Sequence, residues 1–487
     1  MVIYFGFAVG LLNTWFFGKE GLFTSTQYGL TSIFISIATM MMAFAGFAMP
    51  SYIYKFYPYY KDHLPRRKND MLSWALLICT VGFGLVIVAG IAFKSLIVRK
   101  FGEHSPELLK YYDWIFPLGF GLTLYTIMEA YTQNLGKPVL TNFLKEVLWR
   151  LFTTVLILLF VAGIISSFDL FIKLYAFTFP GIAIVLFAYL VFAKKVHFTF
   201  QPSKVSRRYF KRIVAFCLFV YSAGLINTIS QVFDSIVIAS ILPDGLGKAG
   251  IFGLATIMTS VIQVPQRSII STSIPHLARA WKDKNRELLQ KIYERSSINQ
   301  LVFSIGIFLL IALNYREAIV VFDLKRDFLL GFNAFIFLGL TRVIDMGTGV
   351  NAQIIGTSNY WRFELISGIV LLVLMLPLTI ILTRQYDILG PAIANLVSIS
   401  IYNILRIVFL WKKFKLFPFT IQSVYTVLLG AACSAGCYLV FRNIHGFGGL
   451  VLRSIVFTVI YGASAVYLNL SPDIRPVLNT IKNRLRF

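Results

Sequence analysis

The chain has 487 residues, of which 57% are hydrophobic and only 14% are charged. Ordinary soluble domains carry about 25% charged residues, so this composition excludes a soluble globular protein. No polar block or Ser/Gly/Pro-rich linker interrupts the apolar segments, which argues against a string of separate soluble domains. We therefore expect one polytopic membrane protein.

Fourteen segments approach or reach the length of about 20 mostly apolar residues that a membrane-spanning helix needs. In chain order these predicted spans 1 to 14 are 1–17, 29–54, 71–97, 113–132, 139–164, 170–192, 213–238, 250–274, 298–313, 328–355, 363–382, 388–410, 419–441 and 450–468. The apolar runs are continuous rather than alternating, which predicts an all-α membrane protein and not a transmembrane barrel. Span 1 has no basic leader and no small-residue cleavage site, so we expect it to be retained rather than removed as a signal peptide.

Lys and Arg outnumber Asp and Glu by 45 to 21, which gives a net charge of +24. If the N-terminus is cytoplasmic, the inside loops and the tail hold 27 basic residues, the outside loops hold 10 and the spans hold 8. An excess of Lys and Arg in cytoplasmic loops is typical of membrane proteins. The distribution predicts both termini in the cytoplasm and explains the basic charge without a nucleic-acid partner.

Two short patterns recur in the two halves of the chain at nearly one offset. Gly29 precedes Asp62 by 33 positions, and Gly250 precedes Asp283 by the same distance. A Gln-x-x-Gly pattern ends span 4 and recurs 220 positions later at the end of span 10, Gly136 and Gly356 being the two glycines. Equivalent spans are an even number apart, so we expect two parallel bundles related by an axis along the membrane normal.

The repeat and the loops together predict four parts of the chain. Residues 1–193 form an N-terminal six-helix bundle, and 194–212 form a basic cytoplasmic linker. Residues 213–411 form a C-terminal six-helix bundle, and 412–487 form an extra helix pair (spans 13 and 14) followed by a basic cytoplasmic tail. The expected plan is therefore 6+6+2.

A charged side chain at the centre of a span costs about 2.5–3.5 kcal/mol on insertion scales, so it needs a partner, a water-filled cavity or an interface. Ten polar or charged residues are candidates for the substrate path on this ground: Arg342, Arg267, Asp234, Asp345, Gln263, Gln231, Asn227, Lys145, Arg150 and Glu129. Three of them form a polar stripe on span 7, Asn227, Gln231 and Asp234, which we expect to face the bundle interior. Each candidate also has a structural alternative. Arg342 and Asp345, at i and i+3, would neutralise each other, and the cations near the inner span ends would anchor them at the interface.

Three passages carry a resemblance to a known family. Residues 22–30 (Leu-Phe-Thr-Ser-Thr-Gln-Tyr-Gly-Leu) precede span 2, residues 234–252 resemble the family's hairpin between spans 7 and 8, and Pro265 with 275–278 leads into a cytoplasmic amphipathic segment. On these residues the chain resembles the multidrug/oligosaccharidyl-lipid/polysaccharide exporter superfamily, and within it the bacterial flippases of O-antigen and capsule repeat units. The 6+6+2 plan is closer to flippases of lipid-linked precursors than to twelve-span drug exporters. This family usually has a short cytoplasmic lead before span 1, whereas this sequence enters span 1 at Met1, so the true start of the chain is left open.

The resemblance implies a flippase of the bacterial cytoplasmic membrane that moves an undecaprenyl-diphosphate-linked oligosaccharide by alternating access. Its partners would be this lipid-linked oligosaccharide, membrane lipids and other polysaccharide-assembly proteins, and the functional unit would be a monomer. A diphosphate needs cations in a low-dielectric cavity, and Arg267, Arg342, Lys145 and Arg150 are the candidates. The chain has no phosphate-binding Gly-rich motif, so we expect no cofactor. Coupling to H⁺ or Na⁺, to the membrane potential or to the substrate gradient is left open.

Two alternative functions are also left open. An ion-coupled drug or cation antiporter of the same superfamily would share the fold. A membrane glycan polymerase or ligase would need a sizeable outside loop with acid–base residues. The longest predicted outside loop, 98–112, has only 15 residues, with His104 between Glu103 and Glu107. The sequence therefore predicts a transporter with no catalytic residue and no metal site.

Overall fold

The computed structural model describes residues 2–360 and 362–473. These residues form helices throughout, with no strand among them. In the first half the helices are α1 (Val2–Gly18), α2 (Ser25–Ala45), α3 (Met49–His63), α4 (Met71–Ala92), α5 (Lys94–Phe101), α6 (Pro106–Lys110), α7 (Ile115–Asn134), α8 (Pro138–Asn142), α9 (Trp149–Val161), α10 (Phe168–Tyr175), α11 (Thr178–Phe192) and α12 (Lys204–Ile241). In the second half they are α13 (Gly245–Ile262), α14 (Val264–Lys282), α15 (Arg286–Val321), α16 (Phe332–Gly347), α17 (Asn351–Thr357), α18 (Arg362–Tyr386), α19 (Leu389–Phe414), α20 (Ile421–Phe441) and α21 (Gly446–Tyr467). Four short elements join them: η1 (Arg66–Lys68), η2 (Tyr112–Trp114) and η4 (Arg326–Gly331) are 3₁₀ turns, and η3 (Phe143–Leu148) is a π-helix. The predicted all-helical class is confirmed.

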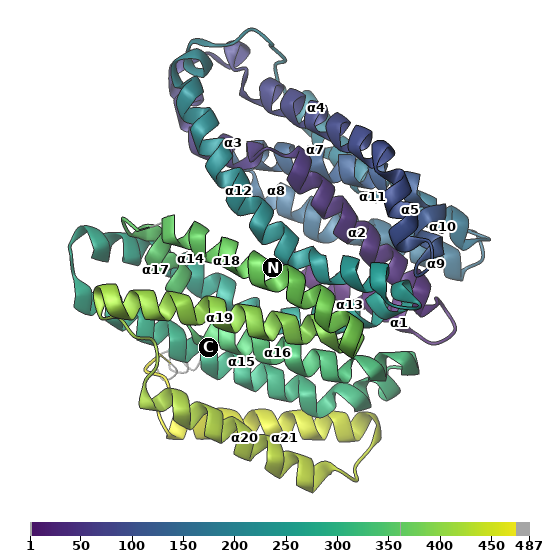
Figure 1. Ribbon diagram of the computed structural model, residues 1–487, viewed down its shortest axis with the longest axis vertical. Coiled ribbons are helices and arrows are strands. Elements are labelled where there is room, and N and C mark those ends of the chain that lie inside the picture. The colour runs from purple at the N-terminus through teal and green to yellow at the C-terminus, as the bar shows by residue number, and fades with distance from the viewer. Residues whose placement is uncertain (1, 361, 474–487) are drawn as a thin grey trace, which may run out of the picture. The chain divides into compact units, whose positions relative to one another are not determined.

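The chain divides into two compact units, one ending at Gly250 and the other beginning at Ile251. This division lies one span later than the predicted start of the second bundle at residue 213, because α12 packs along α2 and α3 (Figure 1). The second part of the predicted linker is helical. Ser203 caps α12 by accepting the amide of Ser206, so the helix begins at Lys204. The predicted basic tail lies outside the described residues.

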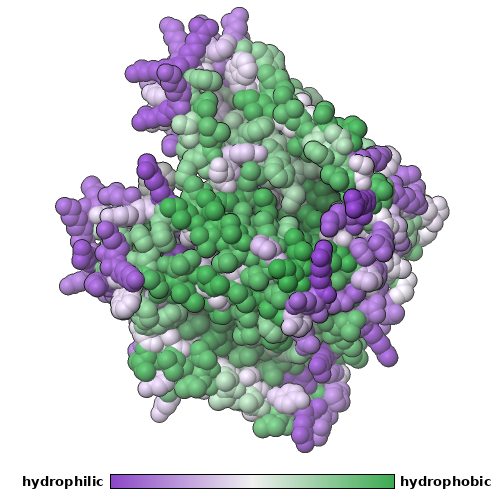
Figure 2. Space-filling model, in the orientation of Figure 1, coloured by the Kyte–Doolittle hydropathy of each residue, from purple (hydrophilic) through white to green (hydrophobic). Residues whose placement is uncertain are grey.

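Among the described residues, eleven helices are long and apolar enough to cross a membrane, so the chain is a multi-pass membrane protein. Figure 2 shows hydrophobic residues over the middle of the helices on the visible face and hydrophilic residues at their ends. Three expected spans are not among the eleven. Span 1 is a short helix, span 4 ends in the polar turn Glu129–Asn134 and span 5 is interrupted by η3. The count of fourteen therefore stays a prediction.

Span 2, expected as one continuous helix, is broken near its middle. α2 ends at Ala45, and the backbones of Phe47 and Ala48 have φ angles of 41° and 55°, in the left-handed region. Pro50 lies in the first turn of α3, where its missing N–H removes no helical hydrogen bond. The expectation of a continuous helix over 29–54 is therefore corrected.

Span 8, the repeat counterpart of span 2, is also divided. α13 ends at Ile262 and α14 begins at Val264, with Pro265 in its first turn. The predicted continuous helix over 250–274 is corrected for the same physical reason. Interrupted helices at corresponding places in two halves are the feature that marks binding sites in transporters built from repeats.

The two glycines that the first repeat pattern pairs, Gly29 and Gly250, lie against each other. A Cβ atom on Gly29 would overlap the carbonyl group of Leu246, and one on Gly250 would lie 2.7 Å from the carbonyl oxygen of Ser25. α2 and the first turns of α13 therefore approach at a distance that only glycine permits. The second pair differs locally, because Gly136 follows α7 with φ +77° whereas Gly356 lies inside α17. The twofold relation itself stays a prediction.

The topology is testable with single cysteines at exposed positions. We expect Arg67→Cys and Gln201→Cys to be shielded from an impermeant thiol reagent in intact cells, because both lie in predicted cytoplasmic segments. Glu103→Cys, in a predicted outside loop, should react under the same conditions. The protein's own four cysteines are free, and the unmodified chain measures their background. Labelling of the first two with protection of the third would reverse the orientation.

Candidate functional site

In the first unit, the break between α2 and α3 leaves carbonyl groups without helical partners, and side chains of neighbouring helices take their place. Tyr221 of α12 donates its hydroxyl to the carbonyl oxygen of Phe44 at 3.0 Å. The carbonyl oxygen of Gly46 accepts the Met49 amide within the turn at 2.8 Å and, in addition, the Cys79 thiol of α4 at 3.4 Å. Irregular backbone at membrane depth requires such partners. A cavity of about 180 Å³ adjoins the break, between α2, α3, α7 and α12.

A charged cluster lies beside the same broken helix. Glu129, near the end of α7, accepts Lys145 Nζ at 3.0 Å on Oε2 and Gln133 Nε2 at 3.3 Å on Oε1. Tyr54 of α3 donates its hydroxyl to Gln133 Oε1 at 2.8 Å. The Glu129 side chain is only 9% exposed whereas that of Lys145 is 40% exposed. The fold thus brings together two predicted path residues, Glu129 and Lys145, from different helices. The Glu129 carboxylate is enclosed, whereas the Lys145 side chain remains accessible.

Lys145 lies on η3, a π-helical segment, and this geometry supports a functional role for the residue. π-Helical turns are rare and frequently occur at functional sites. One turn further on, Arg150 Nη2 pairs with Glu146 Oε2 at 3.1 Å, and its side chain is 22% exposed. A Cβ atom on Gly10 of α1 would lie 3.1 Å from the Arg150 guanidinium, so α1 packs directly over that group. Of the two predicted cations in this unit, Lys145 is the more accessible to a ligand.

In the second unit, α16 and α17 are separated by a break of their own. Gly349 adopts φ +68° between them. Two serines of α15 hold the turn: Ser297 Oγ donates to the Gly347 carbonyl at 2.5 Å, and Ser296 Oγ accepts the Val350 amide at 3.3 Å. The backbone groups freed by this break are therefore satisfied by a neighbouring helix, as in the first unit.

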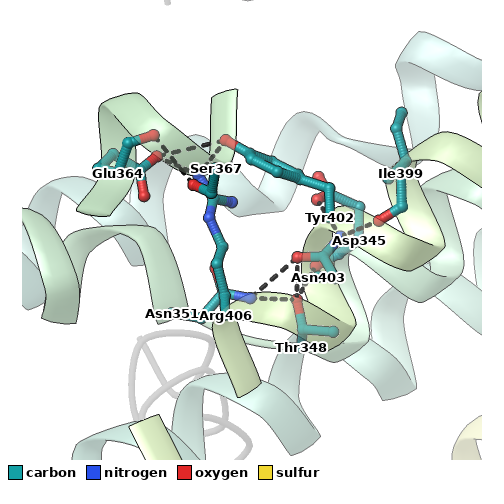
Figure 3. Close-up of polar contacts among 9 residues, drawn as sticks. All are labelled: Asp345, Thr348, Asn351, Glu364, Ser367, Ile399, Tyr402, Asn403 and Arg406. Atoms are coloured by element: carbon teal, nitrogen blue, oxygen red, sulfur yellow. Dashed lines mark hydrogen bonds and ion pairs between the residues drawn. The ribbon is translucent and has the colours of Figure 1, made fainter. Parts of the chain in front are cut away.

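Asn403 of α19 ties together the two sides of this second break (Figure 3). Its Nδ2 donates to Asp345 Oδ1 at 3.0 Å. Its Oδ1 accepts Asn351 Nδ2 at 2.9 Å and Thr348 Oγ1 at 3.1 Å. Asp345, predicted as a companion of Arg342, thus has a partner on α19 that the i, i+3 spacing did not indicate.

One helical turn along α19, the buried Arg406 forms an ion pair that was not predicted from the sequence. Its Nη2 pairs with Glu364 Oε1 of α18 and contacts the Tyr402 hydroxyl, and its guanidinium carbon lies 3.6 Å from the centre of the Tyr402 ring (Figure 3). The Arg406 side chain is 6% exposed. The signal that would have found it is an ionisable residue within the apolar run 388–410.

The other predicted path residues are spread over α12, α14 and α16. On α12, Asn227 and Gln231 are exposed and bonded to each other at 3.2 Å, and Asp234 is buried. Arg267 is exposed on α14, Gln263 lies at the α13–α14 break, and Arg342 is half-buried on α16. Their place on a substrate path stays a prediction. In the described part of the chain, no group of His, Cys, Asp and Glu side chains could hold a metal ion.

An apolar groove runs beside the C-terminal helix pair. α20 and α21 pack on α15, and the groove of about 710 Å³ lies between α15 and α21 with Ile269 of α14 at its edge. Val302, Phe303, Phe457 and Tyr461 contribute to its walls. A groove of this lining suits a long apolar chain.

The fold is that of a membrane transporter. Its marks are the broken spans, the charged cluster beside one of them and the added helix pair. The lipid II flippase MurJ, in an inward closed conformation, matches with a TM-score of 0.73 at 17% identity, covering 96% of this chain and 97% of that one. A multidrug resistance MATE family transporter of the MOP superfamily, in an inward-facing conformation, matches with a TM-score of 0.62 at 15% identity over 85% and 96%. A MOP superfamily transporter from Pyrococcus furiosus gives 0.54 and 16% over 85% and 94%. These similarities establish the fold.

The family follows from the sequence. Residues 22–281, more than half of the chain, match the family described as "Polysaccharide biosynthesis protein", and the chain belongs to it. No curated protein matches the chain. The superfamily indicated by residues 22–30, 234–252 and 275–278 is confirmed.

Proposed function

We propose that the protein flips an undecaprenyl-diphosphate-linked oligosaccharide from the inner to the outer leaflet of the bacterial cytoplasmic membrane by alternating access. The observation that carries this function is the groove between α15 and α21, because a polyprenyl chain needs a long apolar surface while its glycan crosses a polar path. Phe303, Ile307 and Val466 supply that surface.

The extent of the structural similarity favours a lipid flippase over a drug antiporter. The MurJ structure covers 96% of this chain and the MATE structures 85–88%, a difference close to the size of the helix pair α20–α21. One helix of that pair, α21, forms a wall of the groove. A fold that extends over the pair therefore accommodates a lipid tail that a twelve-span antiporter would not need.

Lys145 is the cation we assign to the diphosphate in the first unit. A charge-assisted bond to a phosphate oxygen is a strong one, and the Lys145 side chain, 40% exposed beside Glu129, is accessible to it. When a diphosphate approaches, Lys145 can share its three N–H donors between the phosphate and Glu129. Arg150, Arg267 and Arg342 are further cations for the same headgroup along the path.

The proposal also covers the orientation of the protein in the membrane, its oligomeric state, its partners and the energy source for transport. Both termini face the cytoplasm, the protein acts as a monomer, and its partners are the lipid-linked oligosaccharide and other polysaccharide-assembly proteins. A gradient of H⁺ or Na⁺, the membrane potential or the substrate gradient drives transport.

The lipids of a deletion strain test this function. We expect loss of the protein to cause accumulation of one lipid-linked glycan repeat on the cytoplasmic side, because synthesis continues while export stops. Mass spectrometry of extracted lipids measures the accumulation, and complementation with the intact gene is the control. Unchanged lipids together with altered drug tolerance would contradict the proposal and support the antiporter.

A further inference from the structure

A second apolar cavity, separate from the groove and from the charged cluster, lies in the first unit between α3, α4 and α12. Its volume is about 570 Å³. Ile78 of α4 and Phe210, Val214 and Leu218 of α12 form its apolar wall. The proposed flippase mechanism does not use this space.

The helices around the cavity present apolar side chains outward. On α4, Val81, Leu85 and Val88 are 58%, 60% and 64% exposed, and on α12 Phe210 and Leu218 are 64% and 63% exposed. Such surfaces face hydrocarbon in a membrane protein. A cavity lined this way does not retain water, so a lipid chain is the occupant that the bilayer itself supplies.

The polar side of the cavity has an ordered set of hydroxyl groups. Ser206 Oγ donates to Asp70 Oδ2 at 2.7 Å, so Tyr60, at 2.6 Å, donates to Ser206, and Tyr52 donates to Tyr60 at 2.7 Å. Burial raises the pKa of the Tyr60 hydroxyl, which keeps it a donor at neutral pH. Each hydroxyl proton in this series is donated to the next group toward Asp70, so none is left for a ligand.

One cation on the cavity wall remains available. Arg207 lines the cavity and is exposed. The surrounding segment 194–212 contains seven Lys and Arg residues and no Asp or Glu. Apolar walls with a cationic end complement an anionic lipid whose phosphate lies at the cytoplasmic headgroup level.

We propose that this cavity binds one acyl chain of an anionic glycerophospholipid, with the phosphate at Arg207. The volume lies within the range of about 300–1,000 Å³ that encloses a ligand of ordinary size. An undecaprenyl chain is several times longer than an acyl chain and exceeds this space. The bound lipid fills the gap beside the first turns of α12 and fastens them to α3 and α4.

Photocrosslinking in liposomes tests the site with the full chain. The probe is a phosphatidylglycerol that carries a diazirine in its acyl chain, present at trace level in phosphatidylcholine, and labelled peptides are mapped by mass spectrometry. We expect label on α12 between Phe210 and Leu218 and on α4 near Ile78. Excess unlabelled phosphatidylglycerol should remove it, whereas phosphatidylcholine and undecaprenyl diphosphate should not.

Three variants and two matched controls sharpen the test. Val214→Trp and Leu218→Trp fill the cavity and should lower the labelling about tenfold, since the chain can no longer enter. Arg207→Gln should weaken competition by phosphatidylglycerol about fivefold, the effect of one interfacial cation. Val81→Trp and Arg208→Gln, exposed positions on the same helices outside the cavity lining, are the matched controls and should label as the unmodified chain does.

Three results would overturn the site. Unchanged labelling in both tryptophan variants would show that the acyl chain of the lipid binds elsewhere on the protein. Equal competition by phosphatidylcholine would remove the selectivity for an anionic headgroup. Displacement by undecaprenyl diphosphate would assign the cavity to the flippase substrate instead. None of these readouts requires transport, so failure here is distinguishable from failure of the proposed function.

Discussion

Lys145→Ala is expected to lower the rate of lipid-linked oligosaccharide flipping by about 10- to 100-fold, the equivalent of one charged hydrogen bond of about 1.5–3 kcal/mol. The physical reason is that the phosphate loses a cation at the broken helix, where few waters replace it. Lys145→Arg should retain a measurable part of the rate, because the charge survives although the geometry changes. Flipping in proteoliposomes and the monodispersity of each variant are the two measurements.

A double variant separates substrate binding from simple neutralisation of Glu129. If Lys145 only compensates the enclosed carboxylate, Lys145→Ala with Glu129→Gln removes both charges and restores transport. If Lys145 binds the diphosphate, the double variant is stable and remains slow, which is the result we expect. Lys173, paired with Asp169 at 2.6 Å in the same unit, is the matched control, and Lys173→Ala should transport normally. Recovery in the double variant would contradict our assignment.

Arg406→Ala should destabilise the protein by about 1–3 kcal/mol, because it leaves the half-buried Glu364 carboxylate without the counter-charge and hydrogen bond of the buried guanidinium. Arg406→Lys should recover little of this loss, since an ammonium lacks the planar group that stacks on Tyr402. The measurement is the unfolding temperature of each variant in detergent. A thiol-reactive dye reports unfolding, because it reacts with the three buried cysteines only once they become exposed.

Removing both partners tests the cause of that destabilisation. Arg406→Leu with Glu364→Gln should unfold close to the temperature of the unmodified protein, because no uncompensated charge remains. Arg384→Ala, at the exposed far end of α18, is the control and should leave the unfolding temperature unchanged. A double variant as unstable as Arg406→Ala would show that packing of the guanidinium, and not charge, holds α18 to α19.

Hydropathy predicted the helical class and most helix positions, because burial in lipid depends on the sum of side chains along a run. It did not predict where spans 2 and 8 break. Ala45–Met49 is as apolar as its surroundings, and the left-handed backbone at Ala48 leaves no trace in composition. Pro50 and Pro265 were visible signals, but a proline at this position either kinks a helix or starts a new one, and only the packing decides which.

Pairs on one helix could be predicted from spacing, whereas pairs between helices could not. Glu146 and Arg150 are four residues apart, and they form an ion pair. The sequence indicated that Glu129 and Lys145 are both costly to bury in the membrane. Their pairing joins α7 to η3, 16 positions further along the chain, and spacing within one helix does not predict it. Asp345 shows the same limit, since its partner Asn403 is 58 positions away and reaches it only because α19 packs on α16.

Flipping by purified protein tests the central claim most directly. Protein is reconstituted into sealed liposomes with the lipid-linked glycan extracted from the deletion strain, and an impermeant glycan-cleaving enzyme is added outside. We expect the inner-leaflet pool to become accessible over time, slowly with Lys145→Ala and at the full rate with Lys173→Ala. An inner pool that stays protected with monodisperse protein, under an imposed H⁺ gradient, Na⁺ gradient or membrane potential, would contradict the flippase assignment.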